Sequence, residues 1–590
     1  MLNFLKYVLA TVVGLMLFFF VFLFVVAGIG AAFSSGSETV SVKDNSILRL
    51  DLTQPINEVA EENPFAELGG PFSGSNNVLG LKDIKDVIRK AAEDNNIKGI
   101  SLKVSSASAG WATLEEIRTE LLTFKESGKP IYSYAEYYTE KGYYLASVAD
   151  HIYLNPAGEF EWNGFVSEYE FYKGTFDKLD IKPLVFKVGE FKSAVEPFIR
   201  TNMSEESRLQ TSALINGLYT HYLTNIADSR QLPIQHLRNI SDSLLIYNPQ
   251  TAKDYKLVTE IAYEDDFEDL IKNDLQIEND KKINYISLGK YLKAPSGKST
   301  EGSSNTRIAV LIAEGEIISG KGERGYITSE TFVKDLRKLR DDDKVKAIVI
   351  RINSPGGSSL ASDVMWNDIR KAADKKPVIA SMSDVAASGG YYMAMACDTI
   401  VAQPNTITGS IGIFGLMFNI EDFMARKIGV TFDRVTTSAH ADWPSMTHEM
   451  TDFEKGRIQK YVEEGYETFT KKAAEGRNMP LEKLKDLAKG RVWSGIEAKE
   501  NGLVDVLGGL DQAIEVAAKS ANLEKGAYRV RYYPAKKDML DDFIAKITGD
   551  MEEKAIQNKL GELSAYTDLY QKLVNMRGLQ TRMPFEFNIH

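Results

Sequence analysis

The sequence has a single cysteine, Cys397, among 590 residues, and this scarcity excludes an intrachain disulfide. Such a chain suits a reducing compartment, or an oxidising one in which the fold needs no covalent cross-link. The six histidines are scattered and show no zinc-binding spacing. Acidic residues outnumber basic ones, and the resulting net charge of −12 argues against nucleic-acid binding. We therefore expect no metal, no other cofactor and no nucleic-acid partner.

Charge is absent from residues 7–37, a run rich in Leu, Val, Phe and Ala. A membrane span needs about 20 apolar residues, whereas the apolar part of a cleavable signal peptide has only about 7–15. We therefore expect residues 1–37 to form an uncleaved N-terminal transmembrane anchor. Lys6 precedes the run and Glu38 follows it. The positive-inside tendency then predicts an inner-membrane protein with most of the chain on the extracytoplasmic, periplasmic side.

An internal repeat is the most informative feature of the sequence. Short motifs recur at a nearly constant offset of 246–248 positions across some 160 residues. This regularity predicts two copies of one domain, and two unrelated α/β domains with similar turns are the alternative. The matching pairs include Tyr143-Tyr144-Leu145-Ala146 with Tyr391-Tyr392-Met393-Ala394, Asp150 with Asp398, and Leu257-Val258 with Leu503-Val504.

The chain is too long for one core, because single cores stop growing beyond about 250–300 residues. β-branched runs such as 308–312 and 347–352 alternate with helical patterns such as 332–340 and 453–474. This alternation predicts an α/β fold built from βαβ units with mainly parallel strands. The expected segments are 1–37, the anchor; 46–293, a first domain; 294–306, a Gly/Ser-rich linker; 307–522, a second domain; and 523–590, a C-terminal extension without an assigned role.

Two glycine-containing turns in the second copy carry candidate chemistry. Glycines 356 and 357 follow a predicted strand, and their backbone N–H groups are open to close approach. Ser388 and Gly389 open an apolar helical run, where the first N–H groups have no partner within the helix. Gly356 or Gly357 on one side and Gly389 on the other could bind the oxyanion of an acyl-transfer intermediate. Alone, Ser388 would be a helix cap, but both turns in one unit favour a nucleophile.

The first copy lacks this apparatus. Glu140 stands where the second copy has Ser388, and Lys141 stands for Gly389. The segment Ala107-Ser108-Ala109 replaces the Pro-Gly-Gly turn. A residue needed only for capping or turning would be expected in both copies, so the difference supports a chemical role for Ser388.

A serine nucleophile needs a base. Lys192 lies among apolar neighbours in the first copy and could serve if burial lowered its pKa, although most single lysines are solvated surface charges. Glu190 and Glu196 would oppose that shift if they pointed inward. His440 and His448 remain alternative bases for a histidine triad.

The motifs together resemble the signal peptide peptidase A (protease IV) family in its long tandem-domain form, within the Clp-protease/crotonase superfamily. The resemblance runs from the anchor to about residue 520 and implies two tandem Clp/crotonase-like βαβ domains behind one transmembrane helix. The motifs are Asn-Ser-Pro-Gly-Gly-Ser at 353–358, Ala-Ser-Gly-Gly-Tyr-Tyr at 387–392, Thr-Gly-Ser-Ile-Gly at 408–412, and Phe-Lys-Ser-Ala-Val-Glu-Pro-Phe at 191–198.

The resemblance also implies roles for individual residues. Ser388 would be the nucleophile, Lys192 the general base, and Ser410 the residue that orients the lysine amine. It further implies a serine endopeptidase that degrades remnant signal peptides, a bowl-like homotetramer, structural roles for the histidines, and no metal or ATP.

Two other functions share some of these features. A crotonase-like acyl-CoA enzyme would have the same fold and glycine turns, but it would need neither Ser388 nor Lys192. A non-catalytic membrane scaffold would use the repeat for assembly only. Labelling of Ser388 by a fluorophosphonate would separate a peptidase from both.

Overall fold

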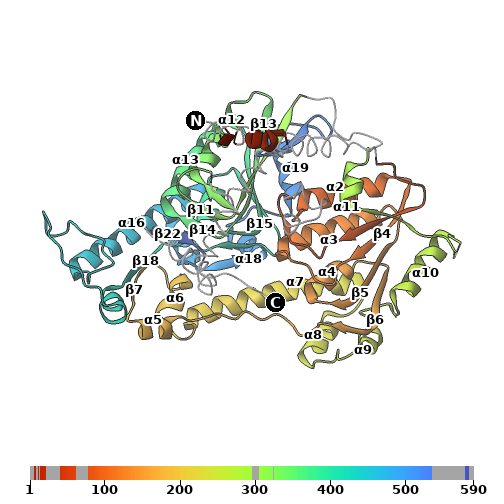
Figure 1. Ribbon diagram of the computed structural model, residues 1–590, viewed down its shortest axis with the longest axis horizontal. Coiled ribbons are helices and arrows are strands. Elements are labelled where there is room, and N and C mark those ends of the chain that lie inside the picture. Colours follow the sequence, from red (N-terminus) through yellow and green to blue (C-terminus); the bar gives the residue numbers. More distant parts are fainter. Residues whose placement is uncertain are drawn as a thin grey trace.

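The computed structural model describes residues 6–7, 11, 13–20, 40–60, 78–278, 280–295, 305–322, 325–534 and 579–583. Most of the predicted anchor, linker and extension lies outside these residues. Within them, no helix combines the length and the hydropathy that a membrane crossing requires. Two largely parallel sheets with helices packed against them dominate the described chain (Figure 1).

The first sheet lies within residues 46–287 and has the strand order β8-β6-β5-β4-β1-β9, with every neighbouring pair parallel. Its strands are β1 (Ser46–Asp51), β4 (Ile97–Lys103), β5 (Ile131–Tyr138), β6 (His151–Phe160), β8 (Glu260–Ile261) and β9 (Asn284–Ser287). Helices of this part include α2 (Leu81–Glu93), α3 (Trp111–Lys125), α4 (Glu140–Ala146), α8 (Ile234–Asp242), α9 (Pro249–Asp254), α10 (Glu264–Leu275) and α11 (Leu288–Lys293).

The second sheet repeats this arrangement. The parallel order β20-β16-β15-β13-β10-β21 matches the first sheet strand for strand, and β15 additionally pairs with β17, which pairs with β19. The strands are β10 (Arg307–Glu314), β13 (Val345–Ser354), β15 (Val378–Ala387), β16 (Thr399–Ala402), β17 (Ile407–Gly409), β19 (Val492–Ser494), β20 (Val506–Leu507) and β21 (Arg529–Tyr533). The helices include α12 (Ser329–Asp341), α13 (Ser359–Ala373), α14 (Gly389–Ala394), α16 (Asp452–Gly476), α17 (Leu481–Leu487), α18 (Gly495–Asn501) and α19 (Leu510–Ser520).

Equivalent residues make equivalent contacts in the two halves. The hydroxyl of Tyr143 donates to the Leu257 carbonyl at 2.6 Å, and that of Tyr391 donates to the Leu503 carbonyl at 3.0 Å. Asp150 accepts from the Ile131 N–H at 2.9 Å, and the matching Asp398 accepts from the Val378 N–H at 2.8 Å. These shared contacts, together with the strand order, confirm the predicted repeat. The predicted strands 308–312 and 347–352 and helices 332–340 and 453–474 are also confirmed.

The first half of the chain reaches across to the second. Strand β7 (Lys182–Lys187) pairs antiparallel with β18 (Phe414–Asn419) over six residue pairs. The chain returns through the long helix α7 (Glu205–Arg230), which runs along one edge of the molecule, from α5 (Lys173–Leu179) and α6 (Glu196–Ile199) toward α8 (Figure 1). This excursion carries the segment around Lys192 into the second half.

Strands β7 and β18 belong to a third sheet of order β12-β11-β14-β22-β18-β7. Its other members are β11 (Glu316–Ile318), β12 (Tyr326–Thr328), β14 (Gly356–Ser358) and β22 (Leu579–Arg582). The sheet therefore joins distant parts of the sequence, from β7 to β22, beside the glycines at 356 and 357.

Buried charges hold the two halves together. Arg351 on β13 has no solvent exposure, and its guanidinium lies 2.9 Å from Glu58 and 2.8 Å from Glu116 of the first half. Burial alone would favour protonation of Glu116, but Arg351 and Lys85 hold its pKa at about 2. Removing one member of such a network would leave an uncompensated buried charge.

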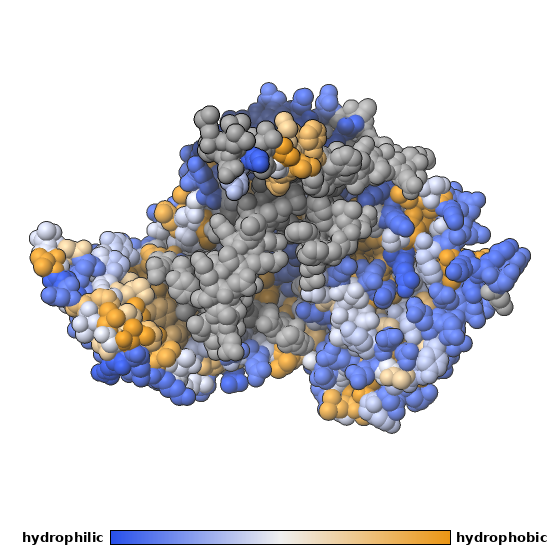
Figure 2. Space-filling model, in the orientation of Figure 1, coloured by the Kyte–Doolittle hydropathy of each residue, from blue (hydrophilic) through white to orange (hydrophobic). Residues whose placement is uncertain are grey.

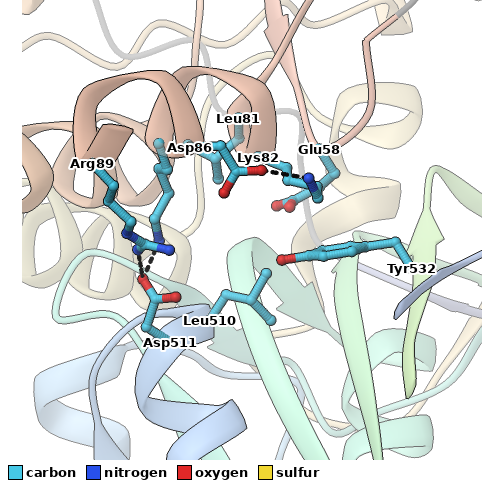
Figure 3. A pocket seen from close by; sticks show the side chains of 9 residues that line it. Glu58, Leu81, Lys82, Asp86, Arg89, Leu510, Asp511 and Tyr532 are labelled. Carbon is cyan, nitrogen blue, oxygen red and sulfur yellow. Dashed lines mark hydrogen bonds and ion pairs between the residues drawn. The ribbon is translucent and has the colours of Figure 1, made fainter. Parts of the chain in front are cut away.

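A small cavity lies next to this network, between α2 on one side and α19 and β21 on the other (Figure 3). Lys85 lies 2.8 Å from Asp511, Arg89 contacts the same carboxylate, and Lys82 lies 5.2 Å from the centre of the Tyr532 ring. The cavity measures about 10 Å³, close to the space that one water molecule needs. It is therefore part of the domain interface and too small for a peptide.

Candidate active site

Ser388 stands at the junction between β15 and α14. Its backbone angles are φ 54° and ψ −108°, a conformation that a residue with a side chain rarely adopts and that costs about 1–3 kcal/mol. The Ser388 N–H donates to the Gly409 carbonyl at 2.8 Å, and its carbonyl accepts from Tyr392 in the first turn of α14 at 2.8 Å. The surrounding backbone thus fixes a strained turn that presents the hydroxyl.

Lys192 approaches Ser388 from the loop between β7 and α6. Its Nζ lies 2.9 Å from Ser388 Oγ, 2.9 Å from Ser410 Oγ and 3.1 Å from the Ser410 carbonyl oxygen. Lys192 and Ser388 are 196 positions apart in the sequence and come from different halves of the repeat. The structure therefore brings all three residues of the predicted dyad and its orienting serine together within one chain.

The environment of Lys192 is dry. The side chains of Lys192, Ser388 and Ser410 have no solvent exposure. Burial lowers the pKa of Lys192 well below its usual range, because the charged ammonium loses its hydration. The neighbouring acids do not counter this shift, since Glu190 pairs with Lys489 at 3.3 Å and the Glu196 carboxylate accepts from Ser204. A neutral amine beside a hydroxyl can accept its proton.

Several contacts that fix the Lys192 loop had no signal in the sequence. Gln210 of α7 donates to the Phe191 carbonyl at 3.0 Å and accepts from the Val492 N–H at 3.2 Å, so it ties the loop to β19. A β-carbon on Gly490 would lie 2.7 Å from Lys192 Cβ, closer than such atoms approach. Gln210 and Gly490 are separated from Lys192 in the sequence, and a single Gln or Gly carries no pattern from which such a contact could be predicted.

The glycines predicted for the oxyanion hole converge beside Ser388. Gly356 and Gly357 have φ angles of +100° and +153°, in the region that favours glycine. A β-carbon on Gly356 would lie 2.7 Å from the Gly389 nitrogen, so these two backbones are in close contact. The Gly356 N–H itself donates to Ser354 Oγ at 3.2 Å. The two glycine turns thus meet beside Ser388, where an oxyanion hole would have to form.

Comparison with known proteins agrees with this geometry. The family described as peptidase family S49 matches the chain in two places, at residues 123–278 and 370–524. The chain belongs to peptidase family S49. It is a serine peptidase of the long type with two S49 repeats, related to the proteins named Protease 4.

Curated relatives match the chain over most of their length. Protease 4 of Salmonella typhi is 37% identical over 563 residues, which cover 92% of this chain and 89% of that protein. The chloroplastic serine protease SPPA of Arabidopsis thaliana is 35% identical over 453 residues, covering 76% and 67%. Protease 4 of Haemophilus influenzae is 33% identical over 453 residues, covering 75% and 73%.

A solved structure adds little to this assignment. A mutant of ClpP1 from Listeria monocytogenes aligns with 35% of this chain and 94% of its own, at 20% identity and a TM-score of 0.23. Such a score carries no argument, so the α/β fold of this S49 peptidase rests on the strand order and on the two family matches.

The two candidate histidines of the S49 peptidase are engaged with carboxylates. His440 Nδ1 lies 2.9 Å from Glu454 near the start of α16, and His448 Nδ1 lies 3.0 Å from Asp442. Both rings thus have partners other than Ser388, whose hydroxyl has Lys192 beside it. Among the described residues, no group of three or more His, Cys, Asp or Glu side chains is placed to hold a metal ion.

The first repeat of the S49 peptidase has a carboxyl group at the position of Ser388. Glu140 is buried at the start of α4 and accepts from the Gly164 N–H at 2.9 Å, while Thr139 caps the helix through the Gly142 N–H. Burial raises the pKa of Glu140 to about 7. The first repeat thus keeps the strand–helix junction and lacks the nucleophile.

Proposed function

We propose that the chain is a membrane-anchored endopeptidase that cleaves peptides with a Ser388/Lys192 dyad. The observation that carries the proposal is the buried amine of Lys192, 2.9 Å from Ser388 Oγ. Family membership gives a serine peptidase, and this contact supports Lys192 as its base, because desolvation lowers the pKa of the lysine amine.

The geometry supports a two-step reaction. Ser388 Oγ attacks the peptide carbonyl carbon while its proton passes to Lys192 Nζ, and N–H groups of the glycine turns stabilise the negative charge on the carbonyl oxygen. The lysine ammonium then donates that proton to the departing amine, which leaves an acyl-enzyme. Lys192 next takes a proton from water, whose hydroxide attacks the ester carbonyl, and the ammonium returns that proton to Ser388 Oγ as the bond to the acyl group breaks. The Ser410 hydroxyl, at 2.9 Å, holds the amine in one rotamer throughout.

The proposed substrates are apolar peptides at the membrane, in particular remnant signal peptides. The uncharged run at residues 7–37 supports an anchor in the inner membrane with the peptidase on the periplasmic side. An anchored enzyme would meet such peptides where they are released. We propose the assembly as a homotetramer on the basis of the family resemblance.

An exposed apolar surface supports assembly. Figure 2 shows hydrophobic residues gathered at the end of the molecule where α5, β7 and β18 lie. Large apolar side chains in the segment after β18 are also exposed, and exposed apolar patches often mark protein contacts. They include Ile428, Val430, Phe432 and Val435. A second copy of the chain is the occupant that the tetramer would supply.

Peptide hydrolysis tests the proposed function directly. The full chain in detergent is given a fluorogenic apolar peptide, and wild type is compared with Ser388→Ala. We expect turnover by wild type and its loss in the variant, because the variant has no nucleophile. Turnover that survives in Ser388→Ala would reject the proposed nucleophile. A fluorophosphonate that fails to label the folded wild type at Ser388 would favour an acyl-CoA enzyme or a scaffold.

A further inference from the structure

A carboxylate of the second repeat is bound by the first repeat shortly before the nucleophile. Asp384 lies on β15, which ends at Ala387, and Ser388 follows directly. The Thr113 N–H of α3 donates to Asp384 Oδ1 at 2.9 Å, and Thr113 Oγ1 donates to Asp384 Oδ2 at 2.6 Å. Strand β15 and helix α3 thus meet at the boundary between the two halves (Figure 1).

Helix α3 has no cap from its own N-terminus. Its N-cap residue is Gly110, which has no side chain, and its first turn contains no acidic residue. The first N–H groups of a helix lack partners within the helix and favour a negative charge beside them. The carboxylate of Asp384 is that charge, and it fits closely, because a β-carbon on Gly110 would lie 2.1 Å from Asp384 Cγ. Asp384 therefore caps a helix of the other repeat.

The matching helix of the second repeat is capped locally. Helix α13 follows Ser358, the counterpart of Gly110, and Ser358 Oγ accepts from the Ala361 N–H at 3.3 Å. The counterpart of Asp384 in the first repeat is Glu136, which is exposed. The contact across the boundary therefore distinguishes the strand that carries the nucleophile.

Asp384 lies where the regular pairing of β15 is interrupted. On one side, the register with β13 shifts, so that residues 383–385 lie opposite Asn353 alone. On the other side, β15 changes its partner from β16 to β17 between Met382 and Val385. Extra residues of this kind recur beside active sites, where they bend a strand and redirect its side chains.

Side-chain contacts hold this interruption in place. Besides the contact of Asp384 with Thr113, Asn353 Oδ1 accepts from the Val385 N–H at 3.3 Å. Asn353 opens the motif that leads to the glycine turn, and Val385 begins the last part of the strand before Ser388. The two contacts therefore set how the end of β15 is joined to the rest of the molecule.

We propose, on the basis of the proposed Ser388/Lys192 mechanism, that Asp384 is a positioning residue. Its contact with α3 holds the end of β15 and keeps Ser388 Oγ within reach of Lys192 Nζ. The first repeat thus acts on the nucleophile as well as supplying the base. A misplacement of about 1 Å can lower a rate by about 10²-fold, so a contact that touches neither substrate nor dyad can still govern the reaction.

The other role for Asp384 is that of a helix cap with a structural effect only. The two roles can be separated, because α3 can be given a cap of its own. Gly110 has φ −76° and ψ 164°, angles that a serine N-cap adopts, and Asp384→Ala removes the carboxylate that would obstruct the new side chain. In Asp384→Ala/Gly110→Ser, α3 would be capped as α13 is, while β15 would have lost its tie to α3.

The test measures kcat, KM, the rate of fluorophosphonate labelling and the urea midpoint of unfolding for the full chain in detergent. Asp384→Ala should lower kcat and the labelling rate about tenfold, with little change in KM, because the nucleophile is displaced and the peptide is not. Asp384→Asn should restore most of the rate, since the asparagine oxygen also accepts from a helix N–H. Glu136→Ala, at the exposed matching position, should leave all four quantities unchanged.

The double variant decides between the two roles. We expect Asp384→Ala/Gly110→Ser to regain the urea midpoint of wild type and to stay about tenfold slower in kcat and in labelling. It also carries the test if Asp384→Ala alone does not fold. Wild-type kcat in the folded double variant would overturn the positioning role and leave the peptidase standing. Absence of both hydrolysis and labelling in wild type would overturn the proposed function, and the positioning role with it.

Discussion

The two repeats share a strand order and differ in the residues proposed for catalysis. Both have the same strand order, and Tyr143 and Tyr391 make the same contact to a distant carbonyl. At the strand–helix junction, however, Glu140 of the first repeat does not have a positive φ, whereas the matching Ser388 of the second repeat has φ at 54°. The fold is thus built without backbone strain at this junction in one repeat, so the strain in the other is not a requirement of the fold.

The glycine turn shows the same contrast. Gly356 and Gly357 have positive φ angles in the second repeat, and the matching residues Ser108 and Ala109 of the first repeat do not. The unusual backbone therefore coincides with the proposed catalytic groups. The first repeat instead contributes Lys192, carried across by β7, so each half supplies what the other lacks.

The largest expected effect separates two lysines whose pKa is lowered by desolvation. Lys192→Met should lower peptide hydrolysis by about 10²–10⁴-fold, because the base is removed without leaving a charge. Lys141→Met makes the same change in the first repeat, where burial also lowers the lysine pKa, and should keep nearly wild-type activity. Comparable losses in both variants, measured as kcat/KM, would mean that these lysines support the fold rather than the reaction.

The next comparison concerns the glycine turn. Gly356→Ala should reduce kcat by about 10²–10³-fold, since the added methyl group strains a φ of +100° and displaces the N–H groups beside Ser388. Ser108→Ala at the exposed matching position of the first repeat should have little effect. If Gly356→Ala retains full kcat, the oxyanion is bound elsewhere.

A smaller effect is expected on stability. Arg351→Met should lower the free energy of unfolding by about 3–5 kcal/mol, because Glu58 would remain buried without its cation and Glu116 would keep only Lys85. Lys103 is the matching residue of the first repeat and pairs with Asp51 near the surface at 3.5 Å, so Lys103→Met should cost less than about 1 kcal/mol. Urea unfolding followed by fluorescence measures both free energies. Equal losses in the two variants would contradict the role of Arg351 in holding the two halves together.

The smallest effect depends on pH. The folded pKa of Glu140 is about 7 and its ordinary value 4.5, so the native state loses stability as the pH rises from 4.5 to 7 and stays less stable above it. Glu140→Gln removes this titration and should stabilise the protein at pH 8 by up to about 3 kcal/mol, with little change at pH 4.5. A shift that is the same at both pH values would show that Glu140 does not titrate in this way.

The sequence predicted those parts of the site that can be recognised by comparing the two repeats and by local chemistry. Ser388 and the glycines stood out because the first copy lacks them, and the alternation of β-branched runs with helical patterns predicted the α/β layers. The contact between Lys192 and Ser388 depends on β7 joining β18, an antiparallel pairing that no periodicity in either strand reveals.

Other contacts were beyond the sequence for the same reason. Gln210 acts on the Lys192 loop from a long helix, and β22 reaches the glycines from a stretch to which no role could be assigned. In the sequence, Arg351 is a single charge within an apolar strand, and its pairing with Glu116 depends on how the two halves pack together. Long-range packing, rather than local propensity, decides each of these.

The most direct test of the Ser388/Lys192 dyad is the pH dependence of fluorophosphonate labelling, with the labelled residue located by mass spectrometry. Wild type should be labelled at Ser388, and the rate should fall as the pH drops through the lowered pKa of Lys192, because a protonated amine cannot accept the serine proton. Lys192→Met should label far more slowly and lose this pH dependence. Labelling at another residue, or an unchanged pH profile in Lys192→Met, would contradict the dyad.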